Sequence, residues 1–78
     1  MTINRLREVH QARPFRAFTM YFADGGTLRV THPESLAYDP VGRTGVFFSP
    51  DDKTHFIDLL LVSRIEVGNG ARRRRRRA

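Results

Sequence analysis

Frequent turn residues constrain the fold of this chain more than any other feature of its sequence. After residue 14 the chain is interrupted at Asp24-Gly25, Pro33, Asp39-Pro40 and Pro50-Asp51. Between several of these interruptions apolar side chains alternate with polar ones, the period of a strand with one buried face. The sequence therefore predicts short strands joined by tight turns.

The N-terminal residues follow a different period. Ile3, Leu6 and Val9 recur at every third position, and Thr2 is a suitable N-cap. This spacing predicts a short amphipathic helix that packs on something through one apolar stripe. We expect it to end before Pro14, because the residue that precedes a proline avoids the helical region.

A hairpin is the best-supported element after the helix. Phe18, Met20 and Phe22 share one face of its first strand, Asp24-Gly25 forms the turn, and residues 28–30 resume the alternation. The remaining segments are expected to be a turn or single helical turn at 32–35, a short strand at 36–38, and strands at 44–49, 55–58 and 63–67. Residues 59–62 are four apolar residues in a row, which fit either a buried strand or one helical turn.

These elements predict a mainly β fold, with an N-terminal helix and about five short antiparallel strands in a bent sheet or small barrel. We expect residues 1–67 to form this domain and residues 68–78 to form a flexible tail rich in glycine and arginine. The layout resembles the Sm-like and SH3-like small barrels. The segment His55-Phe56-Ile57-Asp58 lacks the Tyr-Lys-His triplet by which bacterial Sm-like chaperones bind uridine-rich RNA, so the resemblance implies no binding residues.

A closer resemblance is to short uncharacterised bacterial proteins. It rests on four pieces of sequence: Arg13-Pro14-Phe15, Phe22-Ala23-Asp24-Gly25, His32-Pro33-Glu34 and Ile57-Asp58-Leu59. This resemblance supports the fold and implies no activity.

The net positive charge lies entirely at the C-terminus. The chain has 14 basic and eight acidic residues, and six of the basic ones are Arg72, Arg73, Arg74, Arg75, Arg76 and Arg77, which leaves eight of each sign elsewhere. Like charges repel and this run has nothing apolar to bury, so we expect a solvated arm that binds RNA or DNA without sequence preference. A terminal hexa-arginine can also be an engineered purification tag; we favour a native tail, and the alternative stays open.

Size and composition argue against several other classes. A chain of 78 residues without cysteine has neither disulfides nor thiolate metal sites, which fits a reducing cytoplasm. No apolar run approaches the roughly 20 residues of a membrane span, so we expect a cytoplasmic protein. Unpaired strand edges in so small a sheet lead us to expect a homo-oligomer.

The residue patterns also argue against catalysis. His10, His32 and His55 lack the close spacing of a zinc motif, and the serines lack a nucleophile-elbow pattern. We therefore expect no enzyme activity, no cofactor, no metal and no small-molecule substrate.

Two aromatic residues are candidate surface contacts. Most aromatic side chains here fit a core, but alternation places Tyr21 and Phe47 on the opposite face from their neighbours, where another subunit or a ligand could contact them. The leading hypothesis is a non-catalytic, self-associating small barrel with a nucleic-acid-binding arm. The alternative is a protein-interaction module in which the arginines are incidental or engineered.

Overall fold

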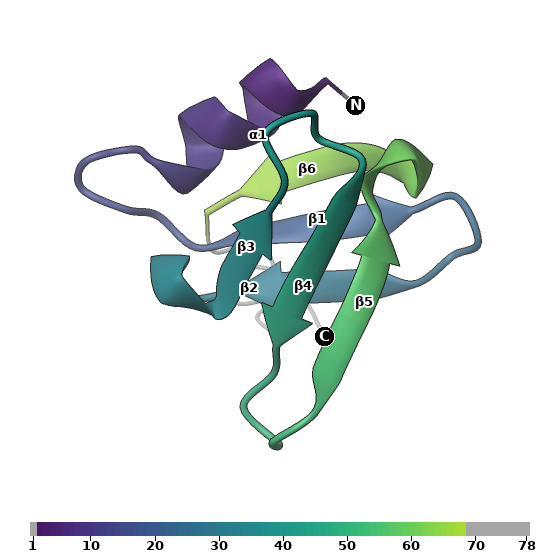
Figure 1. Ribbon diagram of the computed structural model, residues 1–78. Helices are drawn as coiled ribbons and strands as arrows, with labels where there is room; N and C mark the ends of the chain where they lie inside the picture. Colours follow the sequence, from purple (N-terminus) through teal and green to yellow (C-terminus); the bar gives the residue numbers. More distant parts are fainter. Residues whose placement is uncertain (1, 69–78) are drawn as a thin grey trace, which may run out of the picture.

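The computed structural model describes residues 2–68, which form one α-helix and six strands (Figure 1). Helix α1 spans Ile3–His10 and begins as its sequence predicts. The Thr2 hydroxyl accepts a hydrogen bond from the Arg5 N–H at 3.4 Å. The last turn is closed by the Gln11 N–H, which donates to the Arg7 carbonyl at 2.9 Å.

The strands are hydrogen-bonded into two antiparallel three-stranded sheets. One sheet has the order β2-β1-β6, with β1 at Phe18–Phe22, β2 at Thr27–Val30 and β6 at Val62–Val67. The other has the order β3-β4-β5, with β3 at Leu36–Tyr38, β4 at Thr44–Phe48 and β5 at Thr54–Asp58. Figure 1 shows the two sheets as layers whose strands cross steeply, with α1 beside β6 and above β3. The predicted mainly β class is confirmed, while the described residues form two separate sheets instead of one closed sheet.

The strands are joined by tight turns that local side-chain and backbone hydrogen bonds stabilise. In the β1–β2 hairpin Gly25 has a φ of +96°, and the Asp24 carboxylate accepts a hydrogen bond from the Gly26 N–H at 2.9 Å. Two single turns of 3-10 helix, η1 at Pro33–Ser35 and η2 at Leu59–Leu61, provide the other sharp changes of direction. The single helical turn expected around residue 33 is confirmed.

The ambiguity at residues 59–62 is resolved in favour of a turn. The Asp58 carboxylate caps η2 by accepting from the Leu60 N–H at 3.0 Å. Of the three leucines in η2 only Leu59 is buried, while Leu60 and Leu61 are exposed. Val62 instead starts β6, one residue before the predicted strand start at Ser63.

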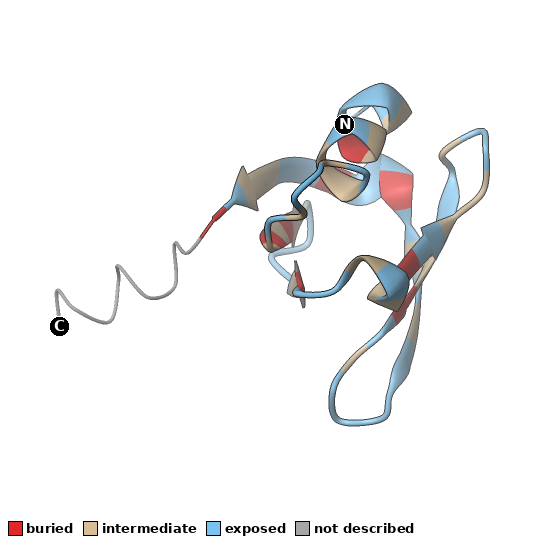
Figure 2. Ribbon diagram, turned by 90° about the vertical axis from the view of Figure 1, so that its left-hand side faces the viewer, coloured by how far each residue is buried: buried red, intermediate tan, exposed pale blue. Residues whose placement is uncertain are grey.

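The core lies between the two layers and is closed by α1. Figure 2 shows buried positions in the helix and in both layers. Its buried side chains are all apolar and come from α1, from η2 and from every strand except β5: Leu6, Phe18, Met20, Val30, Leu36, Phe47, Leu59 and Val62. Gly68 is also buried, and its N–H donates to the Ala17 carbonyl at 2.8 Å.

A hydrogen-bonded histidine fixes the end of α1 to the rest of the molecule. His10 Nε2 lies 2.7 Å from the Pro33 carbonyl, and His10 Nδ1 lies 2.9 Å from the Tyr38 hydroxyl. Because a carbonyl only accepts, Nε2 carries a proton, and in the neutral imidazole Nδ1 then accepts from the Tyr38 hydroxyl. Burial raises the pKa of Tyr38, against a smaller opposing effect of the Arg7 charge, which keeps its hydroxyl a donor.

Two glycines with positive φ allow the role of helix packing to be tested. Gly42 has a φ of +82° and a Cβ there would lie 2.5 Å from the Ile3 Cβ, whereas a Cβ at Gly25 would contact nothing within 4 Å. We expect Gly25→Ala to cost about 1–2 kcal/mol, from backbone strain alone. Gly42→Ala should cost about 1–3 kcal/mol more, because it also pushes α1 outward.

Urea unfolding followed by circular dichroism measures both variants. Equal losses of unfolding free energy for Gly42→Ala and Gly25→Ala would contradict the close contact between the 39–44 turn and α1.

Candidate functional site

The arginine run falls outside the part of the chain that the structure describes. Arg72, Arg73, Arg74, Arg75, Arg76 and Arg77 all follow residue 68. Their proposed role in binding nucleic acid therefore stays a prediction.

The prediction that Phe47 is a surface contact is wrong. Its side chain is only 3% exposed and packs in the core, with its ring 5.8 Å from that of His55. Phe47 does lie on the opposite face from its neighbours, as alternation requires, but its own face is the inner one. Phe48, the next residue, is 52% exposed. Residues 46–48 are all apolar, so their sequence alone does not indicate which of them face inward. That choice depends on which face of β4 packs against the second sheet.

Tyr21 lies on the outer side of its sheet and is already engaged there. Its hydroxyl donates to a Glu66 carboxylate oxygen at 2.7 Å. The guanidinium carbon of Arg64, the residue opposite Tyr21 in β6, lies 4.1 Å from the centre of the tyrosine ring. The ring is therefore partly covered by a cation, a stable arrangement in itself. The contact of Tyr21 with another subunit or a ligand stays a prediction.

The most exposed aromatic side chain is Phe56, at 79%. It lies at the middle of β5, directly opposite Val46, and Val46 in turn lies opposite Ala37. These three residues form an apolar row across the outer side of the β3-β4-β5 sheet, and Phe48 adds to the same side.

Sequence reasoning missed Phe56 although a signal was present. Thr54 and Asp58 are polar and share its face of the strand, while His55 and Ile57 face the other way and are half-buried. A polar residue on each side at a spacing of two indicates a solvent face. Grouping Phe56 with the other aromatic residues as core concealed that alternation.

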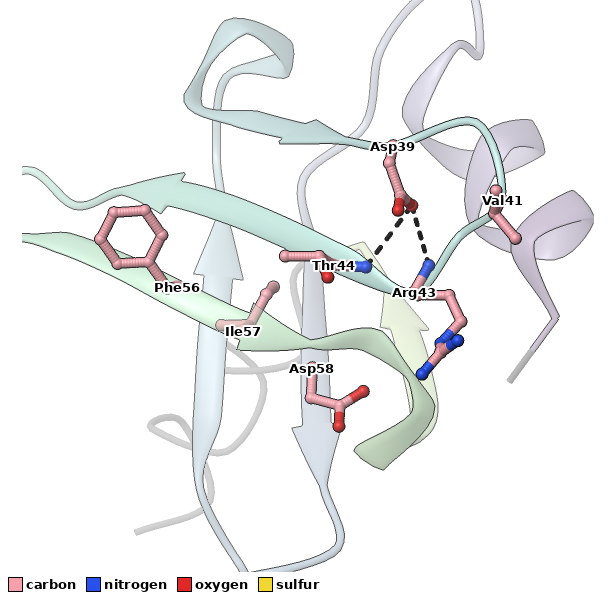
Figure 3. Close-up of a pocket in the computed structure, with 7 residues that line it drawn as sticks. All are labelled: Asp39, Val41, Arg43, Thr44, Phe56, Ile57 and Asp58. Atoms are coloured by element: carbon pink, nitrogen blue, oxygen red, sulfur yellow. Dashed lines mark hydrogen bonds between the residues drawn. The ribbon is translucent and has the colours of Figure 1, made fainter.

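An open hollow lies beside Phe56 at one end of the sheet. It has a volume of about 560 Å³ and is lined by Asp39, Val41, Arg43, Thr44, Phe56, Ile57 and Asp58 (Figure 3). Figure 3 shows the Asp39 carboxylate turned toward the backbone of the 39–44 turn. One of its oxygens accepts from the N–H groups of Gly42 at 2.7 Å, Arg43 at 2.8 Å and Thr44 at 3.4 Å.

These hydrogen bonds make Asp39 a structural group. The bond from the Arg43 N–H has the largest effect in lowering the pKa of Asp39, and the bonds from Gly42 and Thr44 and the Arg43 charge add to it, against partial desolvation. A carboxylate held ionised in this way is a poor general acid or base at neutral pH. The hollow is therefore better suited to contact than to chemistry.

A second groove runs along the free side of β5. Its volume is about 390 Å³. It is lined by apolar side chains from both sheets and from η2, together with a glycine and polar residues: Phe22, Leu28, Phe56, Ile57 and Leu61, with Asp24, Gly26, Thr27, His55 and Asp58. The groove lies where β5 passes the β1–β2 hairpin. Apolar side chains therefore lie next to the open edge of β5.

The described residues offer no arrangement typical of a metal site. Within residues 2–68 no three His, Asp or Glu side chains are grouped so as to hold a metal ion. His10 bonds to Tyr38 and Pro33, His32 lies beside Thr31, and His55 packs on Phe47. No helix in this part of the chain is long and apolar enough to cross a membrane.

Neither family models, nor curated proteins, nor solved structures match this chain. The resemblance to Sm-like barrels and to short bacterial proteins therefore stays a prediction.

The Asp39 turn gives a pH-dependent prediction. Because folding lowers the pKa of Asp39, its carboxylate stabilises the fold above its unfolded pKa, and this contribution is lost as the pH falls through the folded pKa. We expect Asp39→Asn to be less stable than wild type at pH 7, and this difference to shrink as the pH is lowered to about 3.

Thermal unfolding of both proteins across that pH range measures the difference. Glu34→Gln, at an exposed position in η1, is the control for loss of one negative charge. A stability difference for Asp39→Asn that is unchanged by pH would contradict the assigned role of the carboxylate.

Proposed function

We propose that this chain is a non-catalytic β domain that self-associates and holds RNA or DNA, without sequence preference, through Arg72–Arg77. The observation that carries the proposal is the separation of charge along the chain. Residues 2–68 contain all eight acidic residues and eight of the 14 basic ones, so their formal charges cancel. The arm therefore supplies the whole net charge of +6.

The contacts within the folded part support this division of roles. Several of its basic side chains already have partners. Arg29 donates to the Thr19 hydroxyl at 2.7 Å and to the Gly68 carbonyl at 2.8 Å, Arg64 covers Tyr21, and Arg5 pairs with Glu8 at 2.9 Å. A domain with dispersed and engaged cations attracts a polyanion weakly, whereas six adjacent arginines concentrate the attraction.

Self-association is the role proposed for the domain. Small sheets leave edge strands whose N–H and C=O groups template pairing with another chain. Several copies on one nucleic acid would each bring an arm, and linked binding sites raise the overall affinity without new contacts. The absence of cysteine suits a cytoplasmic setting for this function.

A second candidate function is a protein-interaction module. The exposure of Phe56 at 79% and of Phe48 at 52% favours it. In that case a foreign strand or apolar surface would cover the β4–β5 side of the molecule, and the arginines would be incidental or engineered.

Removing the arm tests the proposed function. If six arginines engage duplex phosphates, the affinity of the full chain should fall about a thousandfold between 50 and 200 mM salt. The chain lacking residues 72–78 should bind too weakly to measure, and replacing the six arginines by lysines should preserve most of the affinity. Fluorescence anisotropy with labelled duplex DNA and single-stranded RNA measures all three proteins.

Two results would refute this assignment. Salt-sensitive binding that survives removal of residues 72–78 would transfer the binding site to the domain. A full chain that binds neither RNA nor DNA at 50 mM salt would remove the nucleic-acid function altogether.

A further inference from the structure

We infer that β5 pairs antiparallel with β5 of a second copy, centred on Phe56, so that the two β3-β4-β5 sheets become one continuous sheet. This inference rests on the self-association part of the proposed function and is independent of nucleic-acid binding. It names the surface of association, the kind of partner and the register.

The backbone of β5 is available along one side. Among residues 2–68, β5 is hydrogen-bonded to β4 and to no other strand. The Ser49 N–H donates to the Lys53 carbonyl at 2.9 Å, and the Leu59 N–H donates to the Arg43 carbonyl at 2.8 Å, at the two ends of the β4–β5 ladder. Antiparallel pairs alternate between hydrogen-bonded and non-hydrogen-bonded, so His55 and Ile57 use their backbone groups on β4. The groups of Thr54, Phe56 and Asp58 face the open edge.

These outward groups are self-complementary in one register. With Phe56 opposite Phe56 of the second copy, each Thr54 lies opposite Asp58. Three hydrogen-bonded pairs result, and since each pair exchanges two bonds, the interface has about six. Sliding one strand by two residues in either direction leaves two such pairs and about four bonds. A slide of one residue would place inner side chains opposite outer ones.

The side chains agree with this register. The two Phe56 rings, each 79% exposed in the single chain, become cross-strand neighbours on the outer face. Each Asp58 lies opposite a neutral Thr54, so no like charges meet.

In this arrangement the inward-facing side chains of the second copy's β5 lie over the groove beside β5. Directly opposite residues share a face of the sheet, so His55 and Ile57 of the second copy point to the same side as those of the first. That side opens on the groove of about 390 Å³ lined by Phe22, Leu28 and Leu61. The added strand thereby extends the apolar packing between the layers instead of lying on open solvent.

Charge substitutions at two exposed aromatic positions test the inference. Phe56→Lys places two lysines directly opposite each other at the centre of the interface, whereas Phe48→Lys alters an exposed position on β4, away from the edge. We expect wild type and Phe48→Lys to be dimers by sedimentation equilibrium at about 50 μM. Phe56→Lys should raise the dimer dissociation constant by about a hundredfold or more. Circular dichroism should be the same for all three, since neither side chain is in the core.

Cross-linking tests the register. The chain has no cysteine, so a single introduced one reports a single contact. Opposite residues in a hydrogen-bonded antiparallel pair have Cα atoms about 5.5 Å apart, which lies within the range that a disulfide spans. We expect Phe56→Cys to form a covalent dimer on mild oxidation, and Phe48→Cys to remain mostly uncrosslinked.

The outcomes separate this inference from the proposed function. A dimer that persists in Phe56→Lys and gives no Phe56→Cys cross-link would overturn the β5 pairing while leaving self-association intact. Loss of the dimer in Phe48→Lys alone would replace edge pairing by association through the outer face. A wild-type chain that is monomeric at 50 μM would overturn both the inference and self-association, and nucleic-acid binding is measured separately by anisotropy.

Discussion

The burial of eight apolar side chains between two crossed three-stranded sheets is the interaction on which the rest of this structure depends. A chain of 78 residues buries a smaller share of its surface than a large domain does, and this one has no disulfide to compensate. Helix α1 is therefore needed to cover the core. Leu6 is 1% exposed, and the same helix is held at its ends by the Ile3 contact with Gly42 and by the bonds of His10.

The need to fill this small core also explains what remains outside it. In β4 the inner positions take Gly45 and Phe47, which places Phe48 in solvent. In β5 the inner positions take His55 and Ile57, which leaves Phe56 on the outer side at the edge of the sheet. The exposed aromatic groups are thus a consequence of register, and one of them, Phe56, lies on the strand whose outer backbone edge is unpaired. An edge that combines free hydrogen-bonding groups with an apolar side chain favours association over solvation.

The proposed functions of the two parts of the chain depend on different forces. Arm binding would be electrostatic, long-ranged and weakened by salt. Edge pairing would depend on short-range backbone bonds and apolar contact, which salt affects little. Because residues 2–68 are formally neutral, copies of the domain would meet without strong mutual repulsion. In the proposed function, a neutral assembly of domains would carry several cationic arms, each of which would contribute affinity without selectivity.

Features that depend on neighbouring residues were determined by the sequence alone. The helix and its Thr2 cap, the Asp24-Gly25 hairpin turn, the helical turn at Pro33 and the placement of all excess charge in Arg72–Arg77 follow from spacing and side-chain chemistry within a few residues. Only the tertiary structure decided which side of β4 faces inward and whether residues 59–61 form a strand or a turn. Consecutive apolar residues such as Val46-Phe47-Phe48 satisfy either phase of a strand, and the choice is made only when a second layer packs on one face and excludes water from it.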